Sequence, residues 1–352
     1  MHLQPHHRIA ILFHNGITGP KGKTGLALLR YSENPIAVVI DETCAGESLK
    51  ALTGINREVP IVGTMAAALT YAPDVLAIGL APSGGRLPGL WLEDVRVAIA
   101  AGLSIMNGLH TYFNDDPSLT KHLDPVRYPE QWIWDMRQEP IGLSVGTGQA
   151  SQLSCRRVLA VGTDMAVGKM STCIELNRAT KARGVTSQLI ATGQTALMLG
   201  ATGVALDAVR VDFAAGAIEQ AVMASANHNE VLYIEGQGSL LNPASTATLP
   251  LLRGSQPTHL VLVHKINLER IQHFPDFIIP PIQEVTHLYE TVASAGGTFN
   301  APQIVGIALN TFGVTEDEAK NAISGLSETT GLPCTDVVRF DPAPILDAIL
   351  CT

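Results

Sequence analysis

The stretch VLAVGTDMAVGKMSTCIELNRATKARG, residues 158–184, decides the fold of the second half of the chain. An apolar run leads into a glycine-bounded loop, a Gly-Lys pair and a helical pattern. This order is typical of a phosphate loop, in which backbone N–H groups and the helix N-terminus face the anion and a lysine reaches its oxygens. The stretch therefore predicts a P-loop NTPase-like domain whose cofactor-binding residues are Gly162, Thr163, Asp164, Val167, Gly168, Lys169, Ser171 and Thr172.

The loop departs from the common pattern at two points. Five residues separate Gly162 from Gly168, as in GTDxxVGK sequences of the dethiobiotin synthetase type, and Met170 follows the lysine. The hydroxyl normally found after the lysine holds Mg²⁺. Ser171, one residue later, is rotated by about 100° around the helix axis. We therefore predict no metal site and a ligand whose phosphates serve as handles, such as coenzyme A; a glycine turn without a ligand is the alternative.

Outward from this loop, short apolar runs alternate with helical patterns along the whole chain. Runs of this kind are typical of strands buried on both faces of a parallel sheet. The expected strands are 8–14, 35–41, 60–64, 74–81, 104–110, 156–164, 186–192, 230–236, 258–264 and 303–310. The expected helices are 45–54, 64–72, 89–101, 168–183, 212–226, 281–295, 315–330 and 342–350. A proline-rich, aperiodic region at 113–155 places a boundary near residue 150, so we predict two doubly wound, mostly parallel α/β domains, 1–150 and 151–352.

Composition limits the function classes. The 352 residues are 46% hydrophobic and only 16% charged, which excludes a disordered chain. A net charge of −9 without basic clusters argues against nucleic-acid binding, and no apolar run reaches the about 20 residues of a membrane span. Five scattered cysteines indicate small buried side chains rather than disulfides or a zinc site. We expect a cytoplasmic protein that binds a small molecule and forms a homo-oligomer.

A second glycine loop lies near the N-terminus, in FHNGITGPKGKTGLALLRY, residues 13–31. Gly16 and Gly22 repeat the five-residue spacing, and Lys23 and Thr24 follow. However, Pro20 lacks an N–H group, and Gly25 weakens the helix that would face the anion. Ligand contact and a mobile glycine turn are both open for this loop.

Other polar residues follow predicted strands. Glu235 ends the strand in EVLYIEGQGSLLNP and precedes two glycines, so we expect a functional carboxylate at the ligand-binding edge of the sheet. It would act as a base toward an amine or orient a metal-bound water; a carboxylate that only caps a loop is the alternative. Arg86 in GLAPSGGRLPG could bind a carboxylate or phosphate, or be a solvated loop arginine. His110 and His264 end strands and are either proton carriers or structural residues. Asp212 is expected to cap a helix.

Taken together, VGTDMAVGKMST, ATGQTALMLGATGVALDAVRVDFAAGAIE, IEGQGSLLNP and GSQPTHLVLVHK, with KTGLALLRYS and APSGGRLP upstream, resemble a bacterial family formerly classed as a domain of unknown function. The resemblance covers nearly the whole chain. It implies a Rossmann-like N-terminal domain, a P-loop C-terminal domain and, from some members, D-glutamate N-acetyltransferase activity with acetyl-CoA. The second family motif falls on Gln194, Thr195, Asp207 and Asp212, and the third on 235–239. Where the family often has His-Pro, this chain has Asn242-Pro243.

For this reaction we assign roles to the residues above. Lys169 and the loop amides would bind the CoA phosphates, and Glu235 would take a proton from the substrate ammonium group. Backbone N–H groups of 236–239 would stabilise the oxyanion. The predicted substrate-binding residues are Lys23, Arg86, Gln194, Gln237, Gly238 and Ser239. An ATP- and Mg²⁺-dependent ligase or kinase of the dethiobiotin synthetase kind, or a non-catalytic nucleotide-binding protein, are the alternatives; a dinucleotide oxidoreductase ranks last.

Overall fold

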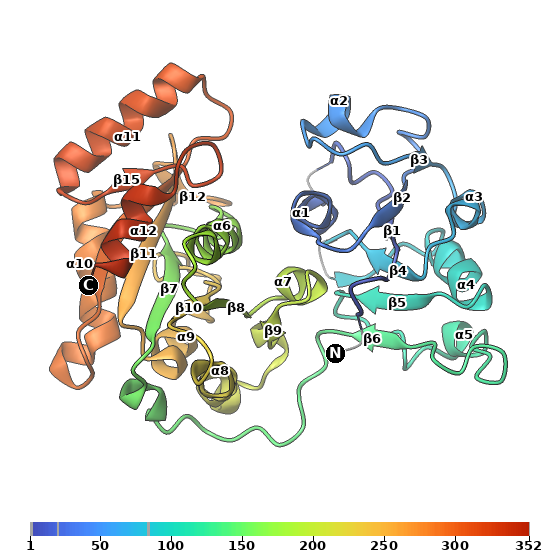
Figure 1. Ribbon diagram of the computed structural model, residues 1–352, viewed down its shortest axis with the longest axis horizontal. Coiled ribbons are helices and arrows are strands. Elements are labelled where there is room, and N and C mark those ends of the chain that lie inside the picture. Colours follow the sequence, from blue (N-terminus) through green and yellow to red (C-terminus); the bar gives the residue numbers. More distant parts are fainter. Residues whose placement is uncertain (1–2, 20, 83–84, 352) are drawn as a thin grey trace. The chain divides into compact units, whose positions relative to one another are not determined.

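Two parallel β-sheets, each with its own helices, make up the structure (Figure 1). The structure is a computed structural model that describes residues 3–19, 21–82 and 85–351, so the expectation for Pro20 lies outside it. One compact unit contains the chain up to Gln138 together with Gln194–Ala201, and the other contains Glu139–Gly193 and the chain from Thr202 onward. The first break along the chain is thus earlier than the expected boundary near residue 150, and a short insertion from the second half joins the first unit.

The first unit has a six-stranded sheet in the order β3-β2-β1-β4-β5-β6, with every pair parallel. Its strands are apolar and almost entirely buried, as a sheet covered on both faces requires. They are β1 (Ile9–Leu12), β2 (Ile36–Ile40), β3 (Ile61–Val62), β4 (Val75–Ile78), β5 (Ser104–Asn107) and β6 (Ile133–Asp135). The helices are α1 (Lys23–Tyr31), α2 (Leu49–Thr53), α3 (Met65–Ala68), α4 (Leu92–Ala100), α5 (Pro117–Thr120) and the inserted α7 (Gln194–Met198).

The strand order of the first unit locates its ligand-binding edge. The chain runs outward from β1 through β2 to β3, then returns to place β4 on the other side of β1. Ligands of such sheets bind outside the carboxyl ends of the strands, at the point where the order reverses. The loops after β1 and β4, which carry Lys23 and Arg86, both begin at this reversal.

The second unit has a seven-stranded parallel sheet in the order β15-β14-β11-β7-β10-β8-β9. The strands are β7 (Arg156–Gly162), β8 (Ser187–Ala191), β9 (Thr202–Gly203), β10 (Val231–Ile234), β11 (His259–Lys265), β14 (Gln303–Asn310) and β15 (Cys334–Thr335), and an antiparallel pair β12 (Arg270–Ile271) and β13 (Phe274–Ile278) lies outside the sheet. The helices are α6 (Lys169–Ala182), α8 (Val211–Ala226), α9 (Thr248–Ser255), α10 (Ile282–Ser294), α11 (Glu316–Thr330) and α12 (Ala343–Leu350).

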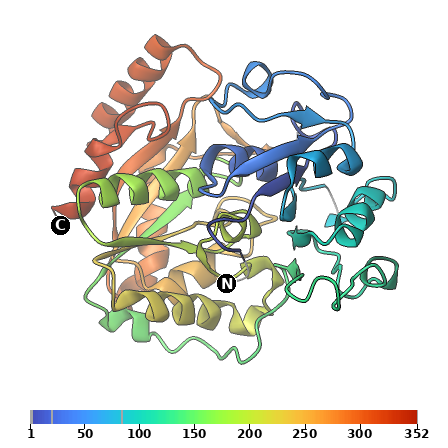
Figure 2. The same cartoon turned by 45° about the vertical axis from the view of Figure 1, so that its right-hand side comes forward.

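The helices of the second unit contact different strands of its sheet. Figure 2 shows α10, α11 and α12, in orange to red, near the β14 and β15 side of the sheet, where they contact those strands. Helix α6 packs on β7, β8 and β10, whereas α8 and α9 pack on each other and on the same part of the sheet. The apolar faces of α8, α9, α10 and α11 form one core with strand side chains such as Leu159, Leu232 and Leu262.

The α/β class, the two parallel sheets and the P-loop fold are as predicted, and each expected strand and helix is present within a few residues. The short elements α5, α7, α9, β6, β9 and β15 and the β12–β13 pair were not predicted. Asp212 is not a cap: Arg210 precedes α8, and Asp212 lies in its first turn. Of the five cysteines, Cys351 is exposed rather than buried. Across the described ranges, no helix is both long and apolar enough to cross a membrane.

Candidate functional site

The phosphate loop connects β7 to α6, at the carboxyl edge of the second sheet. Ala166 and Gly168 both have positive φ angles, 56° and 119°, which turn the backbone sharply before the helix begins. In the part of the chain that the structure describes, the backbone N–H groups from Ala166 to Ser171 donate to no protein acceptor. Consecutive unpaired N–H groups at a helix N-terminus form an anion-binding surface. The loop therefore offers a preformed cradle for phosphate oxygens.

Lys169 is held inside this loop. Its side chain is only 6% exposed, and Nζ donates a hydrogen bond to the carbonyl oxygen of Asp164 at 2.8 Å. Burial lowers the pKa of Lys169 to about 8, an effect that the carboxylates of Asp164 and Glu235 partly oppose. The ammonium group is therefore positioned at the loop and is still protonated at neutral pH.

The Asp164 carboxylate positions the loop from within. It is fully buried and accepts hydrogen bonds from Asn242 Nδ2 at 2.7 Å, from the Gln272 N–H at 2.6 Å and from the Met165 N–H at 2.6 Å. With its oxygens engaged in this way, Asp164 fixes the loop to two distant segments. Its predicted contact with a cofactor would have to come from the backbone. Asn242 is thus a partner of the phosphate loop.

Glu235 follows β10, the strand next to β7. Its carboxylate is 4% exposed, and Oε2 accepts hydrogen bonds from the Thr192 N–H at 2.9 Å and the Gly193 N–H at 3.0 Å. Burial raises the pKa of Glu235 to about 7, and these N–H donors and Lys169 moderate the rise. A carboxyl group that titrates near neutral pH can exchange a proton with a substrate.

The loop after Glu235 corrects one prediction. Ser239 is almost fully buried, and its N–H donates to Ser245 Oγ at 2.9 Å, so it is not available to an oxyanion. Gln237 and Gly238 are partly exposed, and their N–H groups have no acceptor within the described ranges. Gln237 Nε2 also lies 3.3 Å from Glu235 Oε1. Gly236 is buried, and its backbone forms a hydrogen bond with Cys173. The expected oxyanion donors at 236–239 therefore reduce to Gln237 and Gly238.

Three side chains that stabilise the loop come from distant segments. The Tyr289 hydroxyl donates to the Gly162 carbonyl at 2.7 Å and accepts from the Leu240 N–H at 3.1 Å. Asn310 Nδ2 donates to the Val167 carbonyl at 2.9 Å. Thr163 Oγ1 lies 2.9 Å from His264 Nδ1. Sequence reasoning missed both Tyr289 and Asn310. Asn310 ends a strand, which was a weak signal, and Tyr289 lies within a helix and had no signal at all. Burial lowers the pKa of His264 to about 4, so it is a neutral partner rather than a proton carrier at pH 7.

Around the loop, the side chains of Thr172, Asp164 and Glu235 carry oxygen atoms suited to Mg²⁺, but all three are already hydrogen-bonded within the protein. Thr172 Oγ1 donates to the Gly168 carbonyl at 3.2 Å and is buried, and the Asp164 and Glu235 carboxylates already accept two or more N–H groups each. No cluster of three or more His, Cys, Asp or Glu side chains suited to a metal lies in the ranges that the structure describes. The donor set therefore does not fit a Mg²⁺ site held by the protein alone.

The loop after β1 in the first unit has a different hydrogen-bonding pattern. The N–H groups of Asn15 and Ile17 point to the fully buried carboxylate of Asp41, at 3.3 and 3.5 Å. The Gly25 N–H, in the first turn of α1, donates to the Gly79 carbonyl at 2.7 Å. Lys23 is exposed at the start of this helix. Protein acceptors thus take N–H groups that a phosphate would need.

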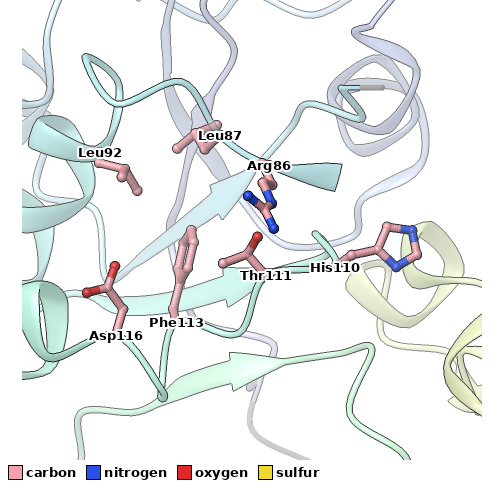
Figure 3. Close-up of a pocket in the computed structure, with 7 residues that line it drawn as sticks. All are labelled: Arg86, Leu87, Leu92, His110, Thr111, Phe113 and Asp116. Carbon is pink, nitrogen blue, oxygen red and sulfur yellow. The ribbon is translucent and has the colours of Figure 1, made fainter. Parts of the chain in front are cut away.

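Arg86 lines a cavity of the first unit, of about 500 Å³, with Leu87, Leu92, His110, Thr111, Phe113 and Asp116. Figure 3 shows its guanidinium group directed toward Thr111 and Phe113, with Asp116 farther along the cavity wall. Apolar side chains separate the cation from the carboxylate, an arrangement that suits a small molecule carrying charges of both signs. His110 is exposed, and its backbone N–H donates to the Gly85 carbonyl.

The second family motif is divided between the units. Gln194 and Thr195 belong to the first unit, where Thr195 Oγ1 lies 3.3 Å from Thr24 Oγ1 and α7 packs so closely that a Cβ on Gly108 would come within 2.9 Å of Gln194 Cγ. Asp207 and Asp212 are exposed in the second unit. The predicted substrate-binding residues therefore form two sets: Lys23, Arg86 and Gln194 in one unit, and Gln237, Gly238 and Ser239 in the other.

Comparison with known proteins identifies the family. A family model described as the P-loop domain of the DUF1611 domain of unknown function matches residues 144–346, and a model for the Rossmann-like N-terminal domain of that family matches residues 42–139. This chain belongs to the DUF1611 family. A crystal structure of a DUF1611 family protein from Anabaena variabilis is 57% identical, with a TM-score of 0.95 over 98% of this chain and all of that one.

Two family relatives carry a functional name. A protein from Pseudoalteromonas named D-glutamate N-acetyltransferase is 34% identical over 88% of this chain and 91% of its own length. A protein of the same name from Tritonibacter scottomollicae is 32% identical over 81% of this chain and 84% of its own length. The predicted family resemblance is confirmed, and the relatives named for this activity span most of both domains.

Proposed function

We propose that this chain transfers the acetyl group of acetyl-CoA to the amine of an acidic amino acid, with D-glutamate as substrate. The observation that carries the proposal is the row of unpaired N–H groups from Ala166 to Ser171, ending in a helix that begins with Lys169. Such a loop suits a ligand held by its phosphates, and the names of the two relatives supply the reaction.

Acetyl transfer needs a base, an anion-binding loop and donors for the oxyanion. In our assignment the substrate ammonium group gives a proton to Glu235, and the free amine attacks the thioester carbonyl carbon. The N–C bond forms, the C–S bond breaks, and the second amine proton passes to the departing thiolate, so that the products are an N-acetyl amino acid and CoA. The Gln237 and Gly238 N–H groups are the donors we assign to the tetrahedral oxyanion.

Lys169 has a binding role in this proposal. Protonated and buried at the loop, its ammonium group would leave the Asp164 carbonyl for a phosphate oxygen, which forms a stronger, charge-assisted hydrogen bond. The carboxylate of Asp164 keeps its hydrogen bonds from Asn242 and Gln272, so the loop conformation does not change when Lys169 moves. Arg86 and Lys23, in the first unit, are the cations we assign to the substrate carboxylates.

An ATP- and Mg²⁺-dependent ligase or kinase is the competing proposal, because the five-residue loop spacing resembles that of the dethiobiotin synthetase type. Met170 after the lysine and the engaged carboxylates count against it. A nucleotide-binding protein without turnover is the third possibility.

The decisive experiment incubates the purified chain with acetyl-CoA and D-glutamate, with L-glutamate as the stereochemical control, and measures products by mass spectrometry and free CoA by thiol titration. We expect N-acetyl-D-glutamate and CoA in equal amounts. The same assay on Lys169→Ala should show weak acetyl-CoA binding. Lys181→Ala, which removes an exposed lysine from the other end of α6, should behave as the unmodified chain. ADP formation from ATP and Mg²⁺, without acetylation, would overturn the proposal in favour of the ligase or kinase.

A further inference from the structure

An exposed aromatic side chain lies next to the phosphate loop in the second unit. Phe312 is 77% exposed, one of the most exposed large apolar side chains in the described ranges. It follows β14 by two residues, at the same carboxyl edge of the sheet from which the loop leaves β7, with β11 between the two strands. A ligand that covered the ring would remove apolar surface from water, which is favourable.

Asn310 connects Phe312 to the phosphate loop. Its Nδ2 donates to the Val167 carbonyl at 2.9 Å, and its Oδ1 accepts the Phe312 N–H at 3.0 Å. One side chain thus joins the backbone of the loop to the backbone of the exposed residue. Asn310 therefore fixes the position of Phe312 relative to the loop.

The segment that carries Phe312 is rigidly held. Thr311 is fully buried, and both its N–H and its hydroxyl donate to Asp336 Oδ2, at 2.8 and 2.6 Å. Arg339 Nη1 donates to the carbonyl oxygens of Thr311 and Val314, at 2.9 and 3.2 Å. The exposed ring therefore stands on a fixed backbone between two anchored residues, which lowers the entropy cost of covering it with a ligand.

The surroundings of the ring favour one kind of occupant. Asn310 and Thr311 precede it and Gly313 follows it in the sequence, and the exposed Lys265 is opposite Asn310 in the β11–β14 pairing. A single aromatic face beside an anion-binding loop and a cation suits a planar base that is attached to phosphates. We infer that Phe312 is a stacking platform for the adenine ring of the nucleotide whose phosphates bind the loop; this rests on the proposed function, in which that nucleotide is acetyl-CoA.

Binding measurements on the full chain test the platform. The probes are acetyl-CoA and S-acetyl-4′-phosphopantetheine, which lacks the 3′-phospho-AMP portion of CoA. The variants are Phe312→Leu and Phe312→Tyr. Leucine keeps an apolar side chain without a π face, whereas tyrosine keeps the ring. We expect Phe312→Leu to raise the Kd of acetyl-CoA by about 5- to 100-fold, in the range of base stacking on an aromatic ring, and to leave the Kd of the truncated probe unchanged. Phe312→Tyr should bind both probes as the unmodified chain does.

The control is Val211→Ala, which shortens a 79% exposed apolar side chain at the start of α8 in the same unit. It should change neither Kd. Equal acetyl-CoA affinity of Phe312→Leu and the unmodified chain would overturn the inference. If the unmodified chain binds ATP instead of acetyl-CoA, the proposed function fails, and the same variants are compared with ATP and inorganic tripolyphosphate: loss of ATP affinity alone in Phe312→Leu supports the platform. A chain that binds no adenine nucleotide overturns both.

Discussion

The two glycine loops of this chain share a spacing and differ in what their backbones do. Both follow the first strand of a parallel sheet, both have five residues between glycines, and both lead through Gly-Lys into a helix. In the second unit, the N–H groups from Ala166 to Ser171 have no acceptor in the described structure. In the first unit, the Asp41 carboxylate and the Gly79 carbonyl accept N–H groups of the loop and the first helical turn.

The position of a buried carboxylate explains the difference. Asp41 follows β2, the strand beside β1, and its oxygens accept from the loop itself. Glu235 follows β10, the strand beside β7, but its Oε2 accepts from Thr192 and Gly193, which follow a third strand. A carboxylate that fills the loop acts as an internal anion, whereas one that is held next to the loop leaves the N–H groups for a ligand. A glycine motif therefore indicates phosphate binding only when its donors are free.

The largest expected effect is the loss of kcat when Glu235 is replaced, which the matching change at Asp41 should not cause. Glu235→Gln keeps the side-chain shape and an acceptor for Thr192 and Gly193 but removes the base, so we expect kcat for acetylation to fall by about 100- to 10,000-fold with an unchanged Kd for acetyl-CoA. Asp41→Asn removes an acceptor of several buried N–H groups and should lower the free energy of unfolding by about 1–3 kcal/mol. Steady-state kinetics and urea unfolding measure the two effects. A similar loss of kcat in both variants would contradict the comparison.

The next largest effect is the difference in acetyl-CoA binding between variants of Lys169 and Lys23, the lysines of the two loops. Lys169→Ala removes a charge-assisted hydrogen bond to phosphate and should raise the Kd of acetyl-CoA by about 10- to 100-fold in calorimetric titrations. Lys23 is exposed beside a loop in which Asp41 and Gly79 accept several N–H groups, so Lys23→Ala should leave this Kd unchanged and raise only the KM of the amino acid. Weaker acetyl-CoA binding in Lys23→Ala would show that the first loop binds phosphate after all.

Alanine is unfavourable at both Gly168 and Gly22, but for different reasons. A Cβ on Gly168 meets no atom closer than 3.5 Å, but the φ angle of 119° strains any other residue, by about 1–3 kcal/mol. A Cβ on Gly22 would lie 1.9 Å from the Gly16 carbonyl oxygen, an overlap that costs about 1–3 kcal/mol. Both alanine variants should unfold at lower urea concentrations, and only Gly168→Ala should also bind acetyl-CoA more weakly. Normal acetyl-CoA binding by Gly168→Ala would argue that the loop conformation is not needed for the ligand.

The smallest effect is the pH dependence of kcat/KM. A base must be deprotonated, so activity should rise as pH increases through the pKa of Glu235, about 7. A phosphate-binding lysine must be protonated, so activity should fall as pH increases through the pKa of Lys169, about 8. The expected profile is a narrow maximum between these values. Glu235→Gln should lose the acidic limb while its residual activity keeps the alkaline limb; an unchanged acidic limb would contradict the role of Glu235.

Much of the fold could be predicted because its signals are local. Buried strands such as 156–162 and 231–234 are continuous apolar runs, and the long helices have clear 3.6-residue periods. Short elements such as α7 and β9 carry too few residues for a period, and neighbours from other segments stabilise them. Asp212 was misplaced as a cap because α8 begins one residue before it.

The candidate site was predictable only in part, for a related reason. Gly162, Lys169 and Glu235 have local signatures, a glycine loop and a strand-end carboxylate. Tyr289 and Asn242 act through contacts with residues more than 70 positions away, at Gly162 and Asp164, and no spacing along the chain indicates such contacts. Ser239 had the right local setting for an oxyanion donor, yet Ser245 takes its N–H.

By itself, the sequence determined two parallel α/β domains, a phosphate loop at 162–169 and the family, because apolar runs, glycine spacing and ordered motifs are properties of the chain alone. Only the tertiary structure decided which of the two similar loops keeps its backbone donors free, and which residues hold that loop in shape. These contacts join residues that are far apart in the sequence: Asp41, after β2, accepts N–H groups of the first loop, and Asn310, on β14, donates to the Val167 carbonyl of the second.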